Sequence, residues 1–326
     1  MRPPEAALRI GTRSSALALW QTERVRALLE SAGHDTVRVE IKTTGDLSPD
    51  LPLARIGGRA LFTKQIDDAL LENRIDLAVH SLKDLPTELP AGLSIAAVSV
   101  REDARDALVG RGPLRWSEVP PGAVIATSSL RRRAQLLRAR PDLRVEDVRG
   151  NVDSRLAKLD RRRDWTAIVL ATAGLVRLGL ADRIGERLPP EIMLPAPGQG
   201  ALAVTIRSQD RAVGDAIRQA LHDEPTALQV AAERAFLRRL EGGCQVPIAA
   251  HARPYTEAGH PALRLHGRVI SLDGETAAEG HAAGLVHDEA GARSLGTSLA
   301  ERLLTQGAAA VLAQVRTANL PVVTEP

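Results

Sequence analysis

The sequence contains very little cysteine and few aromatic residues. Its 326 residues include one cysteine, Cys244, which excludes an internal disulfide and any metal site built from several cysteines. Aromatic residues make up only 2% of the chain, so its cores must consist mainly of Leu, Val, Ile and Ala. The eight histidines show no zinc-type spacing such as HExxH. No metal site is therefore expected.

Long apolar segments are also missing. The longest apolar stretch, residues 167–176, is interrupted by Thr172 and is far too short to span a membrane. Residues 1–8 lack the apolar core of a signal peptide, so we expect a cytoplasmic protein with no membrane partner. Hydrophobic residues (44%) and charged residues (25%) are present at the levels of a globular protein, and the length predicts two or three domains.

The basic residues are almost all arginine. Of 43 basic residues only four are lysines, which leaves 39 arginines. Arginine holds carboxylates and phosphates through two parallel hydrogen bonds, which lysine cannot do. A codon bias toward arginine would give the same count, so composition alone leaves both explanations open. A net charge of +3 and the scarcity of aromatic residues disfavour a nucleic-acid partner.

Three segments repeat an apolar run, a turn of hydroxyl residues and a helical pattern. They are residues 8–30, 123–140 and 167–180. Strand–turn–helix units of this kind build α/β sheets, and the helix N-termini at their turns attract anions. A fourth apolar run, residues 77–79, places Lys83 and Asp84 just past the carboxyl end of a strand, where such sheets bind ligands.

Two breaks divide the chain. The first is the charged stretch 101–106, and the second is the Pro- and Gly-rich stretch 188–200. The second break contains Gly198-Gln199-Gly200, which is too short for a dinucleotide-binding motif and favours a hinge between domains. Beyond it, the patterns predict a strand at 201–206, a helix from 225 to about 241, a strand at 263–270 and helices at 294–304 and 308–315. The sequence therefore predicts α/β regions followed by a C-terminal α+β domain.

Arginine clusters follow the turns of these units. The positions are Arg13, Arg131, Arg132, Arg133, Arg149 and Arg155. Cations at a helix N-terminus oppose the helix dipole, so the clusters indicate an anionic ligand in one cleft. The alternative is a solvated helix face.

Two other features have more than one explanation. The Lys83-Asp84 pair is either a salt-bridge partner of nearby arginines or a group that offsets a developing cation and transfers a proton. Cys244 lies in the sequence EGGCQVP, whose glycines and proline predict an exposed turn. A thiol there could serve as a covalent attachment point, whereas a lone cysteine is more often a small buried hydrophobe.

Six stretches, in order along nearly the whole chain, resemble the hydroxymethylbilane synthase (porphobilinogen deaminase) family. They are RIGTRSSALALWQ (9–21), HSLKDLP (80–86), TSSLRRR (127–133), RGNVDSRLAKLD (149–160), LPAPGQGAL (194–202) and EGGCQVPI (241–248). The chain departs from the family pattern at Thr44, Ala60 and Gln65. None of these is a residue to which the resemblance assigns catalysis.

The resemblance implies an α/β fold in which two similar domains, like those of periplasmic anion-binding proteins, face each other across a cleft. A smaller C-terminal α+β domain would carry the cysteine. Domain 1 would comprise residues 1–100 and 200–220, domain 2 residues 105–195, and domain 3 residues 223–326. A monomer is the family expectation.

The resemblance also implies a reaction. Four porphobilinogen molecules would be joined head to tail with release of ammonia, giving hydroxymethylbilane for tetrapyrrole (haem) biosynthesis. A dipyrromethane cofactor, made from two substrate units, would be attached covalently to Cys244. Because each pyrrole carries an acetate and a propionate, an arginine-lined cleft suits the growing chain.

By resemblance, each site residue receives a role. Asp84 would be catalytic. The cofactor would be bound by Cys244, Lys83, Ser129, Arg131, Arg132, Arg155 and Asp84, and the substrate by Arg13, Ser15, Arg149, Arg155, Arg177 and Gln199. A competing interpretation, a non-catalytic two-domain anion-binding protein, explains the fold and the arginines. It does not require the EGGCQVP motif, the third domain or the Lys83-Asp84 pair, and it would need an export signal.

Overall fold

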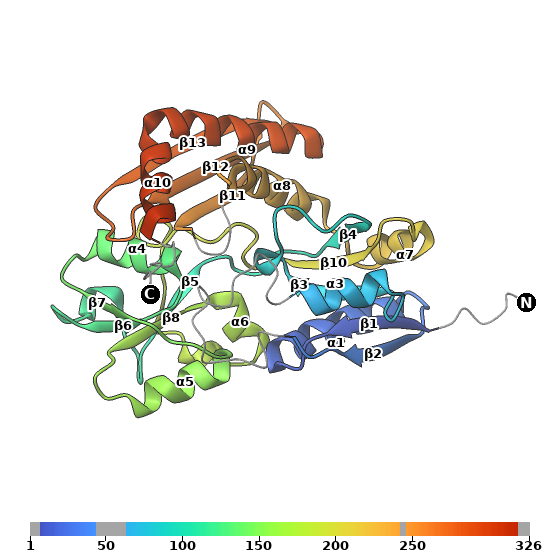
Figure 1. Ribbon diagram of the computed structural model, residues 1–326, viewed down its shortest axis with the longest axis horizontal. Helices are drawn as coiled ribbons and strands as arrows, with labels where there is room; N and C mark the ends of the chain where they lie inside the picture. Colours follow the sequence, from blue (N-terminus) through green and yellow to red (C-terminus); the bar gives the residue numbers. More distant parts are fainter. Residues whose placement is uncertain (1–6, 44–62, 242–245, 319–326) are drawn as a thin grey trace, which may run out of the picture.

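The computed structural model describes residues 7–43, 63–241 and 246–318, arranged around three β-sheets. Figure 1 shows two of the sheets side by side, with the third lying above them. Residues 44–62, which include Thr44 and Ala60, and residues 242–245, which include Cys244, lie outside the described residues. No described helix is long and apolar enough to cross a membrane.

The first sheet has five strands, of which one comes from a distant part of the sequence. Its order is β2 (Thr36–Glu40), β1 (Leu8–Thr12), β3 (Leu77–Ser81), β10 (Leu202–Arg207) and β4 (Leu93–Val98). β1 is parallel to β2 and β3, whereas β10 is antiparallel to β3 and β4. Its helices are α1 (Ala16–Ser31), α3 (Lys64–Leu71) and α7 (Arg211–Leu221).

The second sheet repeats this arrangement. Its order is β7 (Arg144–Glu146), β6 (Val124–Ala126), β8 (Ala167–Ala171), β5 (Asp106–Val109) and β9 (Glu186–Arg187). β6 is parallel to β7 and β8, and β5 is antiparallel to β8 and β9. Its helices are α4 (Leu130–Ala139), α5 (Val152–Arg161) and α6 (Thr172–Arg177). The predicted third helix, 173–180, is therefore shorter than its sequence pattern suggested.

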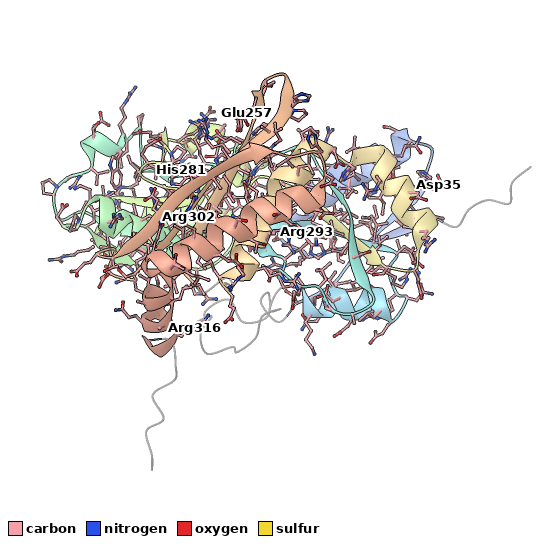
Figure 2. The ribbon with its side chains drawn as sticks, turned by 90° about the horizontal axis from the view of Figure 1, so that it is seen from above. Asp35, Glu257, His281, Arg293, Arg302 and Arg316 are labelled. Carbon is pink, nitrogen blue, oxygen red and sulfur yellow. The ribbon has the colours of Figure 1, made fainter. Side chains whose placement is uncertain are left out.

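The C-terminal part is an antiparallel sheet covered by helices. β11 (Ile248–Glu257), β12 (His260–Ile270) and β13 (Ala277–Leu285) pair in sequence order. Two long helices, α8 (Glu224–Arg239) and α9 (Glu289–Leu303), pack on it together with the short α10 (Ala309–Ala318), and Figure 2 shows α9 with Arg293 and Arg302 on it. The ring of Phe236 lies against Gly267, where any side chain would clash. The predicted fold class is thus confirmed.

Two linkers connect the first two sheets. The outgoing linker runs from β4 to β5, and the returning linker leads from the second sheet back to β10. They lie together, because Ser99 N–H donates to the Leu202 carbonyl and Glu102 N–H donates to the Gly200 carbonyl. The two predicted sequence breaks fall on these linkers. The domain boundaries themselves remain a prediction.

Candidate functional site

A cavity of about 490 Å³ lies between the first two sheets. Both sheets and the returning linker contribute to its walls. Nine of the residues singled out from the sequence line it, namely Arg13, Ser15, Lys83, Asp84, Arg132, Arg149, Arg155, Arg177 and Gln199. Its charged lining comprises six cations and only two carboxylates. The cavity is therefore suited to a ligand that carries several negative charges.

The strand–turn–helix units place these side chains at the cavity. Ser15 is the N-cap of α1 and accepts a hydrogen bond from Ala18 N–H at 3.3 Å. Ser129 caps α4 in the same way, accepting from Arg132 N–H at 3.5 Å. Serine at these positions satisfies helix N–H groups that would otherwise lack partners. Ser129 itself does not line the cavity.

Asp84 and Lys83 end a short 3₁₀ helix, Leu82–Asp84, directly after β3. The Lys83 ammonium donates to Gln199 Oε1 at 3.1 Å. Burial lowers the pKa of Lys83 to about 8, although Asp84 and Asp106 act to raise it. Asp84 is exposed at the cavity wall, and no described residue forms an ion pair or hydrogen bond with its carboxylate. Asp84 therefore presents a carboxylate to whatever occupies the cavity.

Arg131 and Arg132 are buried and paired with Asp106. Arg131 Nη1 lies 2.8 Å from Asp106 Oδ2, and Arg132 Nη2 lies 2.7 Å from Asp106 Oδ1. Arg131 also donates to the Leu194 carbonyl, and Arg132 donates to the Val169 carbonyl. This burial rules out the solvated helix face for these two arginines. Arg132 lines the cavity, whereas Arg131 lies behind it.

Two further arginines of the cavity lack an ion-pair partner among the described residues. Arg149 and Arg155 form no ion pair with any described residue, and Arg155 Nε donates only to the Gly150 carbonyl, at 2.7 Å. Burial, followed by repulsion from Arg132 and Arg149, lowers the pKa of Arg155 to about 10. Arg177 donates to the Gly200 carbonyl at 2.5 Å. Uncompensated guanidinium groups around a cavity favour binding of ligand carboxylates.

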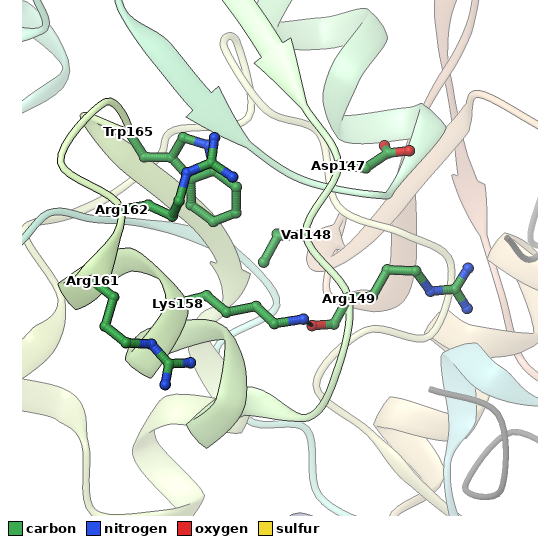
Figure 3. Close-up of a pocket in the computed structure, with 7 residues that line it drawn as sticks. All are labelled: Asp147, Val148, Arg149, Lys158, Arg161, Arg162 and Trp165. Carbon is green, nitrogen blue, oxygen red and sulfur yellow. Dashed lines mark hydrogen bonds between the residues drawn. The ribbon is translucent and has the colours of Figure 1, made fainter. Parts of the chain in front are cut away.

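A second hollow of about 400 Å³ lies beside α5. Figure 3 shows Lys158 directed at the carbonyl of Arg149, to which it donates at 3.1 Å, while the Arg149 guanidinium points away from Trp165. Arg162 lies over the Trp165 ring at 4.7 Å and pairs with Glu146 and Asp164. Because Lys158 and Arg162 are already engaged, the larger cavity is the better candidate site.

Asp106 is a residue of this site that the sequence analysis missed. Its side chain is fully buried at the start of β5 and is bonded to two arginines. An aspartate opening the otherwise apolar strand Asp-Ala-Leu-Val is the signal that could have revealed it, since buried carboxylates are nearly always paired. No group of His, Cys, Asp or Glu suited to a metal ion occurs in the part of the chain that the structure describes.

Two family models match the chain. "Porphobilinogen deaminase, dipyromethane cofactor binding domain" matches residues 8–215, and "Porphobilinogen deaminase, C-terminal domain" matches residues 227–305. The chain belongs to the porphobilinogen deaminase family. The porphobilinogen deaminase of Geobacter metallireducens is 48% identical over 94% of this chain and 94% of its own length. That of Pelobacter propionicus is 48% identical over 96% and 98%, respectively.

Members of the porphobilinogen deaminase family therefore match this chain over almost its full length. Among solved structures, the methionine binding protein MetQ gives a TM-score of 0.42 with 13% identity, covering 66% of this chain and 89% of that chain. A YaeC-family lipoprotein from Enterococcus faecalis gives 0.42 with 14% identity, covering 68% and 94%. These values are too low to bear on function.

Proposed function

We propose that the protein is a hydroxymethylbilane synthase, which joins four porphobilinogen molecules head to tail and releases one ammonia at each step. The observation that carries the proposal is the cavity with its excess of arginine, in a chain 48% identical to porphobilinogen deaminases over almost its whole length. A merely anion-binding protein would not need Asp84, a carboxylate with no ion-pair partner in the described part of the chain, in a cavity lined with cations.

The cavity fits the dipyrromethane cofactor that the family implies. Two pyrroles carry four carboxylates, and the cavity supplies the guanidinium groups of Arg149 and Arg155, which form no ion pair with any described residue. We assign the anchor to Cys244 and the binding of cofactor carboxylates to the cavity residues Lys83, Arg132 and Arg155, with Asp84 at the pyrrole nitrogens. Ser129 and Arg131, the chain neighbours of the lining residues Ser128 and Arg132, would complete this set. When bound, the cofactor supplies the primer to which substrate pyrroles are added.

The substrate would be bound by a second set of cavity residues, which shares Arg155 with the cofactor. These are Arg13, Ser15, Arg149, Arg155, Arg177 and Gln199. Loss of ammonia from porphobilinogen leaves a pyrrole-stabilised cation, which the surrounding arginines repel. Asp84 would stabilise that cation electrostatically and move a proton at the leaving amine. We also propose that the protein acts as a monomer in the cytoplasm, as the family resemblance implies.

The experiment is to incubate the purified protein with porphobilinogen and to measure ammonia and hydroxymethylbilane. The intact protein should exceed its sequence mass by one dipyrromethane, and Cys244→Ala should lose both the added mass and the activity. An active wild-type protein with bare sequence mass would contradict the role of Cys244. Absence of turnover in wild-type protein that carries the added mass would contradict the proposed function.

A further inference from the structure

Asp106 lies where the two linkers meet the cavity. Its carboxylate accepts hydrogen bonds from Arg131 Nη1 at 2.8 Å, from Arg132 Nε at 2.9 Å and Nη2 at 2.7 Å, and from Gln199 Nε2 at 3.1 Å. These donors belong to α4 and to the returning linker. A single buried carboxylate therefore ties together side chains from separate elements.

Gln199 extends this cluster to the cavity wall. Its amide nitrogen also donates to the Ala104 carbonyl at 2.7 Å, which leaves its oxygen facing Lys83. Lys83 Nζ donates to that oxygen at 3.1 Å. The amide group of Gln199 therefore bridges Asp106 and Lys83, a cation that lines the cavity.

The charges of the cluster depend on Asp106. Lys83, Arg131 and Arg132 repel one another, and the repulsion between Arg131 and Arg132 is strong because both are buried. Burial by itself raises the pKa of Asp106, but the charges of Arg131 and Arg132 hold that pKa well below its usual range. The carboxylate is therefore ionised near neutral pH.

We propose that Asp106 is a positioning residue of the cavity, which holds Arg131, Arg132 and, through Gln199, the Lys83 ammonium in the geometry that receives ligand carboxylates. The identity of that ligand rests on the proposed function, whereas the positioning role does not. Asp106 touches no ligand itself, since it is fully buried and does not line the cavity.

The protonation of Lys83 provides a direct readout. Lys83 feels Asp84 and Asp106 as stabilising charges, and Arg131 and Arg132 as destabilising ones. Replacement of Asp106 by Asn therefore lowers the pKa of Lys83 and increases its unprotonated, reactive fraction. Competitive acetylation with limiting acetic anhydride, followed by peptide mass spectrometry, measures that fraction for all four lysines. Lys42, Lys64 and Lys158 serve as internal references.

We expect Asp106→Asn to raise the acetylation rate of Lys83 at pH 7 about three- to tenfold relative to the reference lysines. The matched control is Asp76→Asn. Asp76 is likewise held by two arginines, Arg9 and Arg207, but it directly precedes β3, at the opposite end of that strand from Lys83. Asp76→Asn should leave the acetylation rate of Lys83 unchanged. An unchanged Lys83 rate in folded Asp106→Asn, or an equal rise in Asp76→Asn, would overturn the proposal.

Loss of a buried charge can prevent folding, so a second variant is included. Gln199→Met keeps Asp106 and both arginines but removes the amide that joins Asp106 to Lys83. It should also raise the Lys83 rate, and an unchanged rate would overturn the proposal. Because acetylation is measured without porphobilinogen, the result is independent of turnover. Absence of turnover in the wild-type protein would contradict the proposed function but not the positioning role of Asp106.

Discussion

Arg101 of the outgoing linker and Glu233 of α8 form a buried, two-point ion pair. Arg101 Nη1 lies 2.7 Å from Glu233 Oε1, and Nη2 lies 3.1 Å from Oε2. Glu233 also accepts hydrogen bonds from the N–H groups of Gly198 and Ala252. One carboxylate therefore fixes both linkers to the C-terminal part of the molecule.

Glu233→Gln should strongly destabilise the protein. It leaves the Arg101 guanidinium buried without its counter-charge, which typically costs about 3–5 kcal/mol in the free energy of unfolding. The control is Glu289→Gln, which removes the exposed pair with Arg293, labelled in Figure 2, and should cost no more than about 0.5 kcal/mol. Urea unfolding followed by circular dichroism measures both variants. Equal effects would mean that burial of the Arg101 pair has no energetic importance.

Gly200→Ala should disrupt the contact between the linkers. Gly200 has φ +94°, and a Cβ there would clash with the backbone carbonyl of Glu102, which cannot move aside easily. Gly33 has a similar φ of +89° with open space around it, so Gly33→Ala isolates the conformational cost, about 1 kcal/mol. We expect Gly200→Ala to lower the free energy of unfolding by at least about 2 kcal/mol more than Gly33→Ala does. Urea unfolding followed by circular dichroism measures both variants. Similar losses would show that the linkers separate at little cost.

Asp84→Asn should remove most of the catalytic activity while leaving the fold intact. The change is nearly isosteric and deletes only the charge that would offset the substrate-derived cation. Single-turnover ammonia release should slow by about two orders of magnitude or more, with a smaller effect on substrate binding. Glu88→Gln, an exposed carboxylate nearby, is the control. A rate within a few-fold of wild type for Asp84→Asn would assign the cation's stabilisation to another group.

Arg131 and Arg155 should respond differently to neutralisation. Arg131→Met breaks a buried pair with Asp106 and should lower the free energy of unfolding by about 3 kcal/mol. Arg155→Met loses its hydrogen bond to Gly150 but relieves repulsion from Arg132 and Arg149, so stability should change by no more than about 1 kcal/mol. Both variants should load less cofactor, as seen in the intact mass. The opposite order of stabilities would contradict the charge balance described for the cavity.

The activity should decline as the pH rises through about 8. Protonated Lys83 binds carboxylates, and its pKa of about 8 means that it loses its charge in this range. Between pH 8 and 10.5 the unfolded chain holds more protons at Lys83 than the folded chain, so this residue's contribution to the free energy of unfolding increases with pH. Lys83→Arg should remove the alkaline decline in kcat/KM, because arginine stays charged. Lys64→Arg, at an exposed site, should retain it.

Local sequence was enough to predict many of the strands and helices and the arginine clusters of the candidate site, whereas Ser129 and Arg177 entered through the family resemblance. The run at residues 167–171 is a buried strand, and the hydroxyl turns lead into helices capped by Ser15 and Ser129, because capping and apolar periodicity are local properties. The pattern failed to place the end of α6, which stops at Arg177. The position of Lys83 and Asp84 past β3 also followed from the chain order alone.

Only the tertiary structure decided which charges are paired. Asp106 and Arg131 are 25 residues apart, and Arg101 and Glu233 are 132 apart, so no local pattern joins them. The sequence determined that the protein would have an excess of arginine and two breaks in its α/β pattern. The fold determined that Arg131 and Arg132 pair with Asp106, whereas Arg149 and Arg155 form no ion pair with any described residue. Burial makes the energy of each charge depend on its neighbours in space.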